Sequence, residues 1–382
     1  MSSPAQSYPA AVLAGGEYAA RIIGPADARS LVPAWRELAL KAMEPNVFYE
    51  PDFVLAAEPA FAAPGRLQFL TINRGESLVF LLPFRTVGAG AMMIAEAFRH
   101  PYATTTAPLV AASDARQALH LWLSGGAAQI RVSGWRLQEM PQDGALWQAM
   151  MEATAATGAG LSILSEHRRA LLAPREPDRT YLADALSSKA RKELARQRRR
   201  LAEEGEPANL VLDGADAAGG FEAFLELEAK GWKGRAGTAM LMHEDAVRFG
   251  RQAIGALAGR GQVRIDQILV AGKPVAITVM LLGGGASWLW KVAYDEDFAK
   301  FSPAVQLISG MTGELAANRP GVRLDSCAIP DHPMIDRLWR ERLDIADVAI
   351  GLPGRNAGFA AALALTRAEK AARDFARRLL RR

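Results

Sequence analysis

The stretch PVAITVMLLGGGASWLW, from Pro274 to Trp290, contains no charged residue between Lys273 and Lys291. It is slightly short for a bilayer crossing. β-Branched residues occur before the glycine triplet at 283–285, and aromatic residues follow it. These features favour two buried strands joined by a turn over a membrane span.

The segments around this stretch continue the alternation of strands and helices. Ala271-Gly272 has the composition of a tight hairpin turn, and Ser302-Pro303 is a helix N-cap followed by proline at the first helical position. The expected order is β, α, α, β, β, β, α, β, α, β. Strands are expected at 209–212, 263–270, 274–282, 287–293, 322–328 and 343–350, and helices at 217–229, 243 or 244–257, 303–317 and 333–340.

The N-terminal half has nearly the same order, which predicts a structural duplication without a visible residue-level repeat. A length of 382 residues fits two domains. We expect an N-terminal domain at 1–173, a linker and basic helix at 174–206, a C-terminal domain at 207–352 and a basic tail at 353–382. In the N-terminal half, strands are expected at 17–23, 67–72, 77–84, 91–98, 129–132 and 161–164, and helices at 26–43, 52–57, 113–123 and 144–156.

The composition excludes several classes of protein. Half of the residues are hydrophobic and 23% are charged, which is far from the composition of a disordered chain. A single cysteine, Cys327, excludes an intramolecular disulfide and a zinc cluster built on cysteines. The first 20 residues lack the positive charge that precedes the apolar part of a secretory signal. We therefore expect a cytoplasmic protein without a bound metal.

The formal net charge of +4 is unevenly distributed. Residues 187–200 hold seven basic residues and one acid, and residues 366–382 hold seven basic residues and two acids, which leaves about −7 for the rest. The molecule is thus an acidic body with two basic patches. The tail has the pattern of a basic amphipathic helix, which contacts a membrane or a partner, or docks on its own chain.

Three segments carry a resemblance to a known family: LEAKGWKGRAGTA at 227–239, AYDEDFAKFSP at 293–303 and SSKARKELARQRRRL at 187–201. The chain resembles GNAT acyltransferases, in particular the CelD-type branch associated with cellulose and polysaccharide biosynthesis. It is distantly similar to the Fem-type transferases that add amino acids to peptidoglycan precursors. The resemblance spans residues 187–351. It implies an α/β (α+β) fold of tandem GNAT-like domains, each a mixed, mainly antiparallel sheet flanked by helices.

The resemblance implies that an amine or hydroxyl attacks an acyl thioester, which is acetyl-CoA or another acyl-CoA. In this family the coenzyme A pyrophosphate lies on the N-terminus of the helix after the central strand. The expected contacts are therefore Ser302, Ala304 and Val305, with Lys300 as a nearby cation. The family's glycine-rich turn is absent and Pro303 removes one donor. This departure favours the Fem-like branch, or a capped helix without a ligand, as alternatives.

Glu228, Trp232 and Lys233 lie at and just beyond the end of a helix that breaks at Gly231. An indole beside a cation and a carboxylate suits stacking on a sugar and binding of its polar groups. We therefore predict that these residues bind the substrate. The alternative is that Trp232 packs against its domain and the charges are solvated.

The basic helix places Lys189, Lys192, Arg196 and Arg199 along one face. Such a stripe suits a phosphate, a nucleotide-linked lipid precursor or RNA, so Lys192 and Arg196 are predicted to contact the substrate. The alternative is a solvated helix between the domains. Sequence-specific nucleic acid binding has no support, because the patches lack interleaved aromatic residues and no recognised motif is present.

Asp325, Asp331 and His332 are the strongest candidates for acid–base catalysis. Asp325 lies in an apolar run, where an unpaired carboxylate is costly, and a histidine such as His332 suits proton transfer near neutral pH. Tyr294 is predicted to protonate the leaving thiolate. The alternatives are that Asp331 and His332 cap a helix, that Asp325 pairs with an arginine across the sheet, and that Tyr294 is a core residue.

The predicted function is an acyl-CoA-dependent N- or O-acyltransferase, acting on an amine or hydroxyl of an envelope or exopolysaccharide precursor. Two alternatives are left open. One is a Fem-like transferase that takes its acyl group from charged tRNA, and the other is a non-catalytic GNAT-like scaffold for polysaccharide synthesis. The predicted partners are a small-molecule or saccharide acceptor and, through the basic tail, the inner membrane or a synthase complex.

Overall fold

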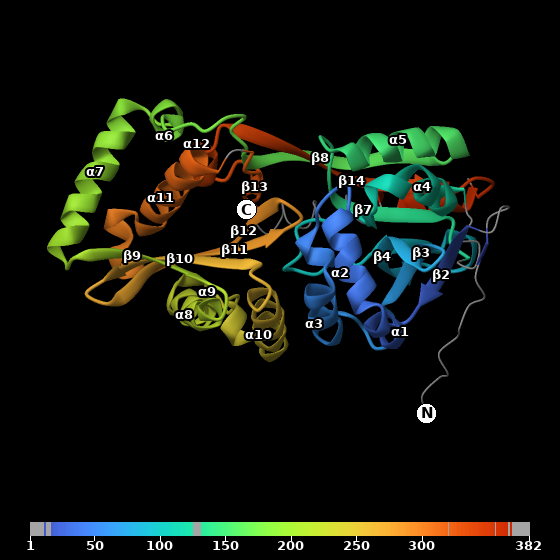
Figure 1. Cartoon of the computed structure of the whole chain (residues 1–382), viewed down its shortest axis with the longest axis horizontal. Helices are drawn as coiled ribbons and strands as arrows, with labels where there is room; N and C mark the ends of the chain where they lie inside the picture. The colour runs from blue at the N-terminus through green and yellow to red at the C-terminus, as the bar shows by residue number, and fades with distance from the viewer. Residues whose placement is uncertain are drawn as a thin grey trace. The chain divides into compact units, whose positions relative to one another are not determined.

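The computed structural model describes residues 11–12, 17–124, 131–319, 321–355, 357–365 and 367–368 (Figure 1). Internal contacts divide the chain into two units. Unit 1 comprises residues 1–51, 61–167 and 344–382, and unit 2 comprises residues 52–60 and 168–343. Each unit is built on a sheet with helices packed against it.

Unit 1 contains a mainly antiparallel sheet in the order β1-β2-β3-β4-β5-β7-β14, in which β5 and β7 are parallel and β6 pairs with β4 outside this path. Its strands are β1 (Ala11–Val12), β2 (Tyr18–Ile23), β3 (Gln68–Arg74), β4 (Ser77–Val87), β5 (Ile94–Ala97), β6 (Leu109–Val110), β7 (Gly134–Pro141) and most of β14 (Glu341–Gly351). Its α-helices are α1 (Pro25–Ser30), α2 (Val32–Lys41), α4 (Ala115–Leu123) and α5 (Ala145–Thr157).

Unit 2 contains a sheet in the order β8-β13-β12-β11-β10-β9, in which β12 and β13 are parallel. Its strands are the last part of β8 (Gly160–Leu172), from residue 168 on, together with β9 (Pro207–Asp213), β10 (Val263–Val270), β11 (Lys273–Gly283), β12 (Ala286–Tyr294) and β13 (Leu324–Asp325). Its α-helices are α3 (Pro51–Phe61), α6 (Tyr181–Ala185), α7 (Ser188–Glu203), α8 (Asp216–Lys230), α9 (Trp232–Arg235), α10 (Glu244–Ala258), α11 (Pro303–Asn318) and α12 (Ile335–Leu338). Figure 1 shows α8 and α10 below this sheet and α11 above it.

The stretch from Pro274 to Trp290 forms the predicted pair of buried strands. β11 and β12 are antiparallel, and their last pair joins Gly283 to Ala286. Gly284 and Gly285 make the turn with φ values of 56° and 84°, which glycine adopts without a steric cost. In the part of the chain that the structure describes, no helix is long and apolar enough to cross a membrane.

Several predicted element bounds are wrong, for local reasons. The helix expected at 26–43 is two helices that meet at Leu31, because Pro33 starts a new first turn. The strand expected at 322–328 is reduced to the two residues of β13, because Cys327 has a φ of 53° that a strand cannot contain. The helix expected at 333–340 is only α12. In place of the strand expected at 129–132, β7 begins at Gly134, and residues 129–130 lie outside the described part.

The last strand of the chain completes the sheet of unit 1. Residues 345–351 of β14 pair antiparallel with β7, and Gly351 lies opposite Gly134. A Cβ on Gly134 would lie 2.4 Å from Ile350 O and 2.6 Å from Phe359 Cδ2, and a Cβ on Gly351 would also lie 2.6 Å from the Phe359 ring. The two glycines therefore allow Phe359 to pack directly on the backbone of this strand pair.

We expect Gly134→Ala to lower the free energy of unfolding by about 1–3 kcal/mol, because the added methyl group overpacks a site lined by backbone. Chemical denaturation of the full chain measures this change. Gly160→Ala, at the start of β8, is the matched control because no heavy atom lies within 4 Å of its added Cβ. Equal stability of Gly134→Ala and the wild type would contradict the close packing of Phe359.

Candidate active site

A β-bulge in β12 directs two consecutive side chains to the same face of the sheet. The register between β11 and β12 shifts by one residue at Trp290. Leu289 and Val292 both pack in the apolar cluster that contains α11 residues. Trp290 lies on the opposite face, where its ring stacks on Phe221 of α8 with centroids 6.2 Å apart. The side chain of Lys291 follows Trp290 to this second face, toward α8.

Lys291 interacts electrostatically with groups from three other segments. These groups are Glu228 of α8, Lys233 of α9 and Cys327, which follows β13. Burial is the largest effect on its pKa; Glu228 and Cys327 oppose the lowering and Lys233 adds to it, so that the pKa of Lys291 falls to about 8. A lysine with this pKa is partly neutral near physiological pH. It can therefore accept a proton from a substrate.

Glu228 is buried and holds the turn between α8 and α9. Its Oε1 accepts a hydrogen bond from Lys233 Nζ at 2.7 Å, and its Oε2 accepts one from the Met240 backbone N–H at 2.9 Å. The predicted helix break at Gly231 is confirmed, because α8 ends one residue before it and α9 begins one residue after it. Glu228 and Lys233 are thus brought together beside Lys291.

Trp232 lies on the exposed side of the same turn. Its indole is 55% exposed, so it does not pack into a core. Glu296, in the 3-10 helix η5 (Glu296–Phe301), accepts hydrogen bonds from the Trp232 backbone N–H and from Arg235 Nη2, both at 2.5 Å. These contacts fasten the turn to the segment that follows β12. An exposed aromatic ring on a fixed turn suits contact with a ligand.

β12 and β13 separate immediately after a short parallel ladder. Only two pairs form it, Ser287 with Leu324 and Trp288 with Asp325. In the described part of the chain, the edge of β12 from Trp290 to Tyr294 has no strand partner on this side. The two strands therefore diverge at the level of Lys291.

Asp325 pairs with an arginine across the sheet. The sequence predicts this pairing as the alternative to a catalytic role. Arg169 Nη2 of β8 donates to Asp325 Oδ2 at 2.6 Å, and these residues are only 2% and 6% exposed. The second carboxylate oxygen, Oδ1, accepts a hydrogen bond from the Cys327 backbone N–H at 2.9 Å. Asp325 thus fixes the backbone at the point where β13 leaves β12.

The other predicted catalytic residues make local contacts. His332 Nδ1 accepts hydrogen bonds from the Met334 and Ile335 backbone N–H groups, both at 3.4 Å, and so caps α12. Asp331 is exposed and has a φ of 55°. Tyr294 is half-buried against the apolar cluster that contains Phe301. Catalytic roles for these residues and for Asp325 stay predictions.

The N-terminus of α11 has the features expected of an anion site. Ser302 has a φ of 51°, and its hydroxyl makes no capping hydrogen bond. The first bond of the helix runs from Gln306 N–H to Ser302 O at 3.1 Å, so the backbone N–H groups of Ala304 and Val305 precede the helical ladder. Within the described residues the buried Gln306 Oε1 has no donor, so an amide N–H of a ligand could satisfy it. These groups fit the phosphate and amide groups of a coenzyme A molecule.

Lys300 is less available to a ligand than the sequence suggested. Its Nζ lies 3.1 Å from Glu204 Oε1 and 4.7 Å from the centroid of the Phe301 ring. Its charge is therefore shared with Glu204, and the backbone groups of α11 become the main expected anion contacts.

The basic segment forms the predicted helix, α7, with Ser187 Oγ accepting from Ala190 N–H at 3.2 Å as its cap. Arg196 is held by Glu193 at 2.6 and 2.8 Å, whereas Lys192 is exposed and has no side-chain partner in the described chain. Leu201 anchors the end of α7 in an apolar cluster with Phe301. Lys192 lies about 14 Å along the helix axis from this anchor. No interaction joins Lys192 or Arg196 to Glu228 across the described residues.

Of the basic tail predicted at 353–382, the structure describes residues 353–355, 357–365 and 367–368, and the rest, including most of its basic residues, lies outside the described part. Among described residues, no group of three or more histidine, cysteine, aspartate or glutamate side chains could hold a metal ion.

Sequence reasoning misses Lys291. In the sequence it is only the charge that ends the uncharged stretch from Pro274 to Trp290. A single charge within a strand that is otherwise apolar is the available signal, because such a charge needs a partner or a function. The residue pattern does not predict the bulge that turns Lys291 toward Glu228.

Residues 188–327 match a family model described as an acetyltransferase (GNAT) domain. No curated protein matches the sequence. The matched segment contains α7, the α8–α9 turn, the bulged strand β12, α11 and Cys327. It therefore includes Glu228, Lys233 and Cys327, the three groups whose charges act on Lys291.

Solved structures share the fold over most of the chain. A crystal structure of FemX has a TM-score of 0.56 and 10% sequence identity, covering 85% of this chain and 96% of that one. The C-terminal domain of a predicted lysylphosphatidylglycerol synthetase from Agrobacterium fabrum has a TM-score of 0.53 and 13% identity, covering 91% and 96%. A conserved protein of unknown function from Bacteroides thetaiotaomicron has a TM-score of 0.51 and 14% identity, covering 86% and 98%. At these identities the likeness shows the fold alone.

The predicted fold class is confirmed. Each unit has a mixed, mainly antiparallel sheet flanked by helices, and unit 2 contains the segment that matches the GNAT domain. Membership of the CelD-type branch stays a prediction.

We expect Asp325→Asn to lower the free energy of unfolding by about 3–5 kcal/mol, because it leaves the buried Arg169 guanidinium without its counter-charge. Thermal and chemical denaturation measure this loss. Asp331→Asn is the matched control, since Asp331 is exposed, and should change stability by less than about 0.5 kcal/mol. If Asp325→Asn were fully stable and inactive, the structural role of Asp325 would be refuted.

Proposed function

We propose that the protein is an acyl-CoA-dependent N- or O-acyltransferase whose reaction takes place beside Lys291. The single observation that carries this proposal is the bulge in β12. It places a lysine of lowered pKa next to the strand edge that opens between β12 and β13. The match of residues 188–327 to a GNAT acetyltransferase domain supports it independently.

The residues around the bulge can perform the steps of acyl transfer. Acyl-CoA supplies a thioester whose C–S bond breaks as the C–N or C–O bond to the acceptor forms. Lys291 Nζ, in its neutral form, takes the proton that the acceptor amine or hydroxyl loses. The Tyr294 hydroxyl, at the end of the same strand, is the predicted donor for the leaving sulfur. Backbone N–H groups on the open edge of β12 are suited to stabilise the oxyanion.

The N-terminus of α11 would hold the pyrophosphate of the co-substrate. The orphan N–H groups of Ala304 and Val305 and the helix dipole favour an anion there. The Ser302 hydroxyl, which makes no capping bond, supplies another donor. These donors take over the role that the sequence assigned partly to Lys300.

An envelope or exopolysaccharide precursor is the proposed acceptor class. The exposed Trp232 ring can stack on a sugar, and Lys233 beside it can bind a hydroxyl or carboxylate. The fold likeness to FemX and to a predicted lysylphosphatidylglycerol synthetase is consistent with a substrate of the cell envelope. We propose that this acceptor lies against the α8–α9 turn.

A Fem-like transferase that uses charged tRNA is the second candidate. The observation that favours it is the exposed basic face of α7, where Lys189, Lys192 and Arg199 have no side-chain partner among described residues. Cations spaced along one helix suit a phosphate backbone. Binding of charged tRNA by a protein that ignores acetyl-CoA would favour this candidate over the first.

We expect Ser302→Asp to weaken acetyl-CoA binding at least about tenfold without loss of stability. Aspartate is a favoured N-cap, yet its carboxylate repels a phosphate at the same helix terminus. Isothermal titration of the full chain measures the affinity.

Ala215→Asp is the matched control for this experiment. Ala215 is the exposed N-cap residue of α8, so the variant adds the same charge at a different helix N-terminus. Unchanged affinity in Ser302→Asp, or no binding by the wild type at millimolar acetyl-CoA, would contradict the proposed site.

The pH dependence of acetyl transfer should report Lys291. Because the pKa of Lys291 is lowered to about 8 and the neutral amine is the base, kcat/KM should rise with pH and level off above about 8. Lys291→Met should lower kcat by roughly 10²–10⁴-fold and should abolish the rise of kcat/KM with pH. Thiol release from acetyl-CoA with a panel of amino sugars measures the rate.

Lys273→Met is the matched control, because Lys273 is an exposed lysine at the start of β11. It should keep both the rate and the pH profile. If kcat/KM still rose with pH in Lys291→Met but no longer did so in His332→Ala, the base would be His332 and the assignment to Lys291 would be wrong.

A further inference from the structure

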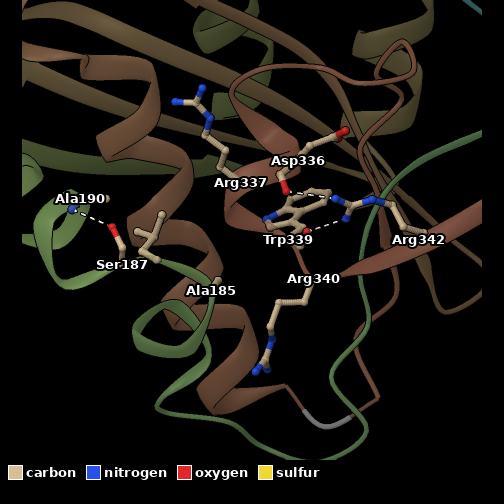
Figure 2. A pocket seen from close by; sticks show the side chains of 9 residues that line it. Ala185, Ser187, Ala190, Asp336, Arg337, Trp339, Arg340 and Arg342 are labelled. Atoms are coloured by element: carbon tan, nitrogen blue, oxygen red, sulfur yellow. Dashed lines mark hydrogen bonds between the residues drawn. The ribbon is translucent and has the colours of Figure 1, made fainter.

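A cavity of about 530 Å³ in unit 2 is lined by three arginines. It lies between the start of α7 and the segment that joins α12 to β14 (Figure 2). Its volume is in the range of small-molecule sites. Its lining residues are Ala185, Leu186, Ser187, Ala190, Asp336, Arg337, Trp339, Arg340 and Arg342. None of them belongs to the groups around Lys291 or to the N-terminus of α11.

The three arginines differ in how far their charge is compensated. Arg340 is paired with Asp178 at 2.6 Å and lies 4.1 Å from the centroid of the Tyr181 ring. Within the described residues Arg342 donates to backbone carbonyls alone, at 2.7 Å to Trp339 O, 2.9 Å to Glu341 O and 3.1 Å to Asp336 O. Arg337 is exposed, and its side chain has no partner in the described part of the chain. Two of the three charges in this cavity therefore lack a carboxylate.

The acid in the lining forms no ion pair with these arginines among the described residues, and the buried Asp336 Oδ1 has no hydrogen-bond partner there. Figure 2 shows the Asp336 carboxylate directed away from Ser187 and Ala190, whereas Arg337 and Arg340 extend on opposite sides of Trp339. Trp339 is buried and held by a hydrogen bond from its Nε1 to Thr312 Oγ1 at 2.9 Å. The arrangement therefore presents separated cations on a fixed wall.

The opposite wall is the N-terminus of a long helix. α7 has 16 residues, and Ser187 caps it by accepting from Ala190 N–H. The backbone N–H groups of Ser188 and Lys189 precede the first bond of the helical ladder, which runs from Arg191 N–H to Ser187 O at 3.0 Å. The helix dipole adds to the positive potential of the arginines.

We propose that this cavity binds a phosphate group, with Arg337 and the N-terminus of α7 as its main contacts. A guanidinium matches phosphate geometry with two parallel N–H donors. A phosphate monoester or pyrophosphate also carries more than one charge, which suits cations on several sides of one cavity. The source of the group is a phosphorylated small molecule or a phospholipid headgroup. The site is separate from the acyl-transfer site and does not rest on the proposed function.

The test uses the full chain and inorganic pyrophosphate as the probe. Phenylglyoxal modifies accessible arginines, and mass spectrometry reads each position separately. Pyrophosphate should slow the modification of Arg337 several-fold and leave Arg21, an exposed arginine in unit 1, unchanged. In isothermal titration, Arg337→Gln should weaken binding about tenfold through loss of one charge-assisted contact, and Ser187→Asp should weaken it about tenfold because its carboxylate repels the phosphate. Arg21→Gln is the matched control and should bind like the wild type.

The outcomes separate the sources and the alternatives. Protection of Arg337 by pyrophosphate supports a free phosphorylated ligand. Protection by phosphatidylglycerol vesicles, with phosphatidylcholine vesicles inert, supports a lipid headgroup. Equal modification of Arg337 with and without both probes would overturn the proposal. So would equal protection by acetate, because a carboxylate would then suffice. Unchanged acetyl-CoA binding by Arg337→Gln would show that the phosphate cavity and the acyl-transfer site are distinct, so a negative result at one site does not refute the proposal for the other.

Discussion

The bulge at Trp290 is the constraint on which the site in unit 2 depends. In a regular strand alternate residues face opposite sides, and Leu289 and Val292 could not both pack toward α11. One extra residue between them resolves this conflict. It turns Lys291 away from an apolar cluster, where an ammonium group would be costly, and toward Glu228. The packing of the core and the position of the reactive lysine therefore have the same cause.

Compensated charges fix the loops around this strand. Glu228 joins Lys233 to the backbone N–H of Met240, so the α8–α9 turn is held by one buried carboxylate. Asp325 joins Arg169 to the backbone after β13. In each case one oxygen meets a cation and the other a backbone donor. Such pairs add little net stability over an apolar pair, but losing one partner is costly, which makes them positioning devices.

The sequence pattern predicted the parts of the fold that depend on local periodicity. The apolar run with its glycine turn predicted β11 and β12, and Ser302-Pro303 predicted the start of α11. It could not give features that depend on distant partners. Arg169 lies 156 residues before Asp325, so only the need for some partner was predictable. The bulge that turns Lys291 toward Glu228 depends on packing from α11 and α8. The packing of Phe359 on the β7–β14 pair depends on two glycines, Gly134 and Gly351, that are far apart in the chain.

A crystal structure of the full chain with acetyl-CoA tests the central claim most directly. The account predicts that the acyl carbonyl lies at the open edge of β12 between Trp290 and Tyr294, within reach of Lys291 Nζ. It also predicts that the pyrophosphate contacts the backbone N–H groups of Ala304 and Val305. Acetyl-CoA bound elsewhere, with Lys291 remote from the thioester, would contradict the account.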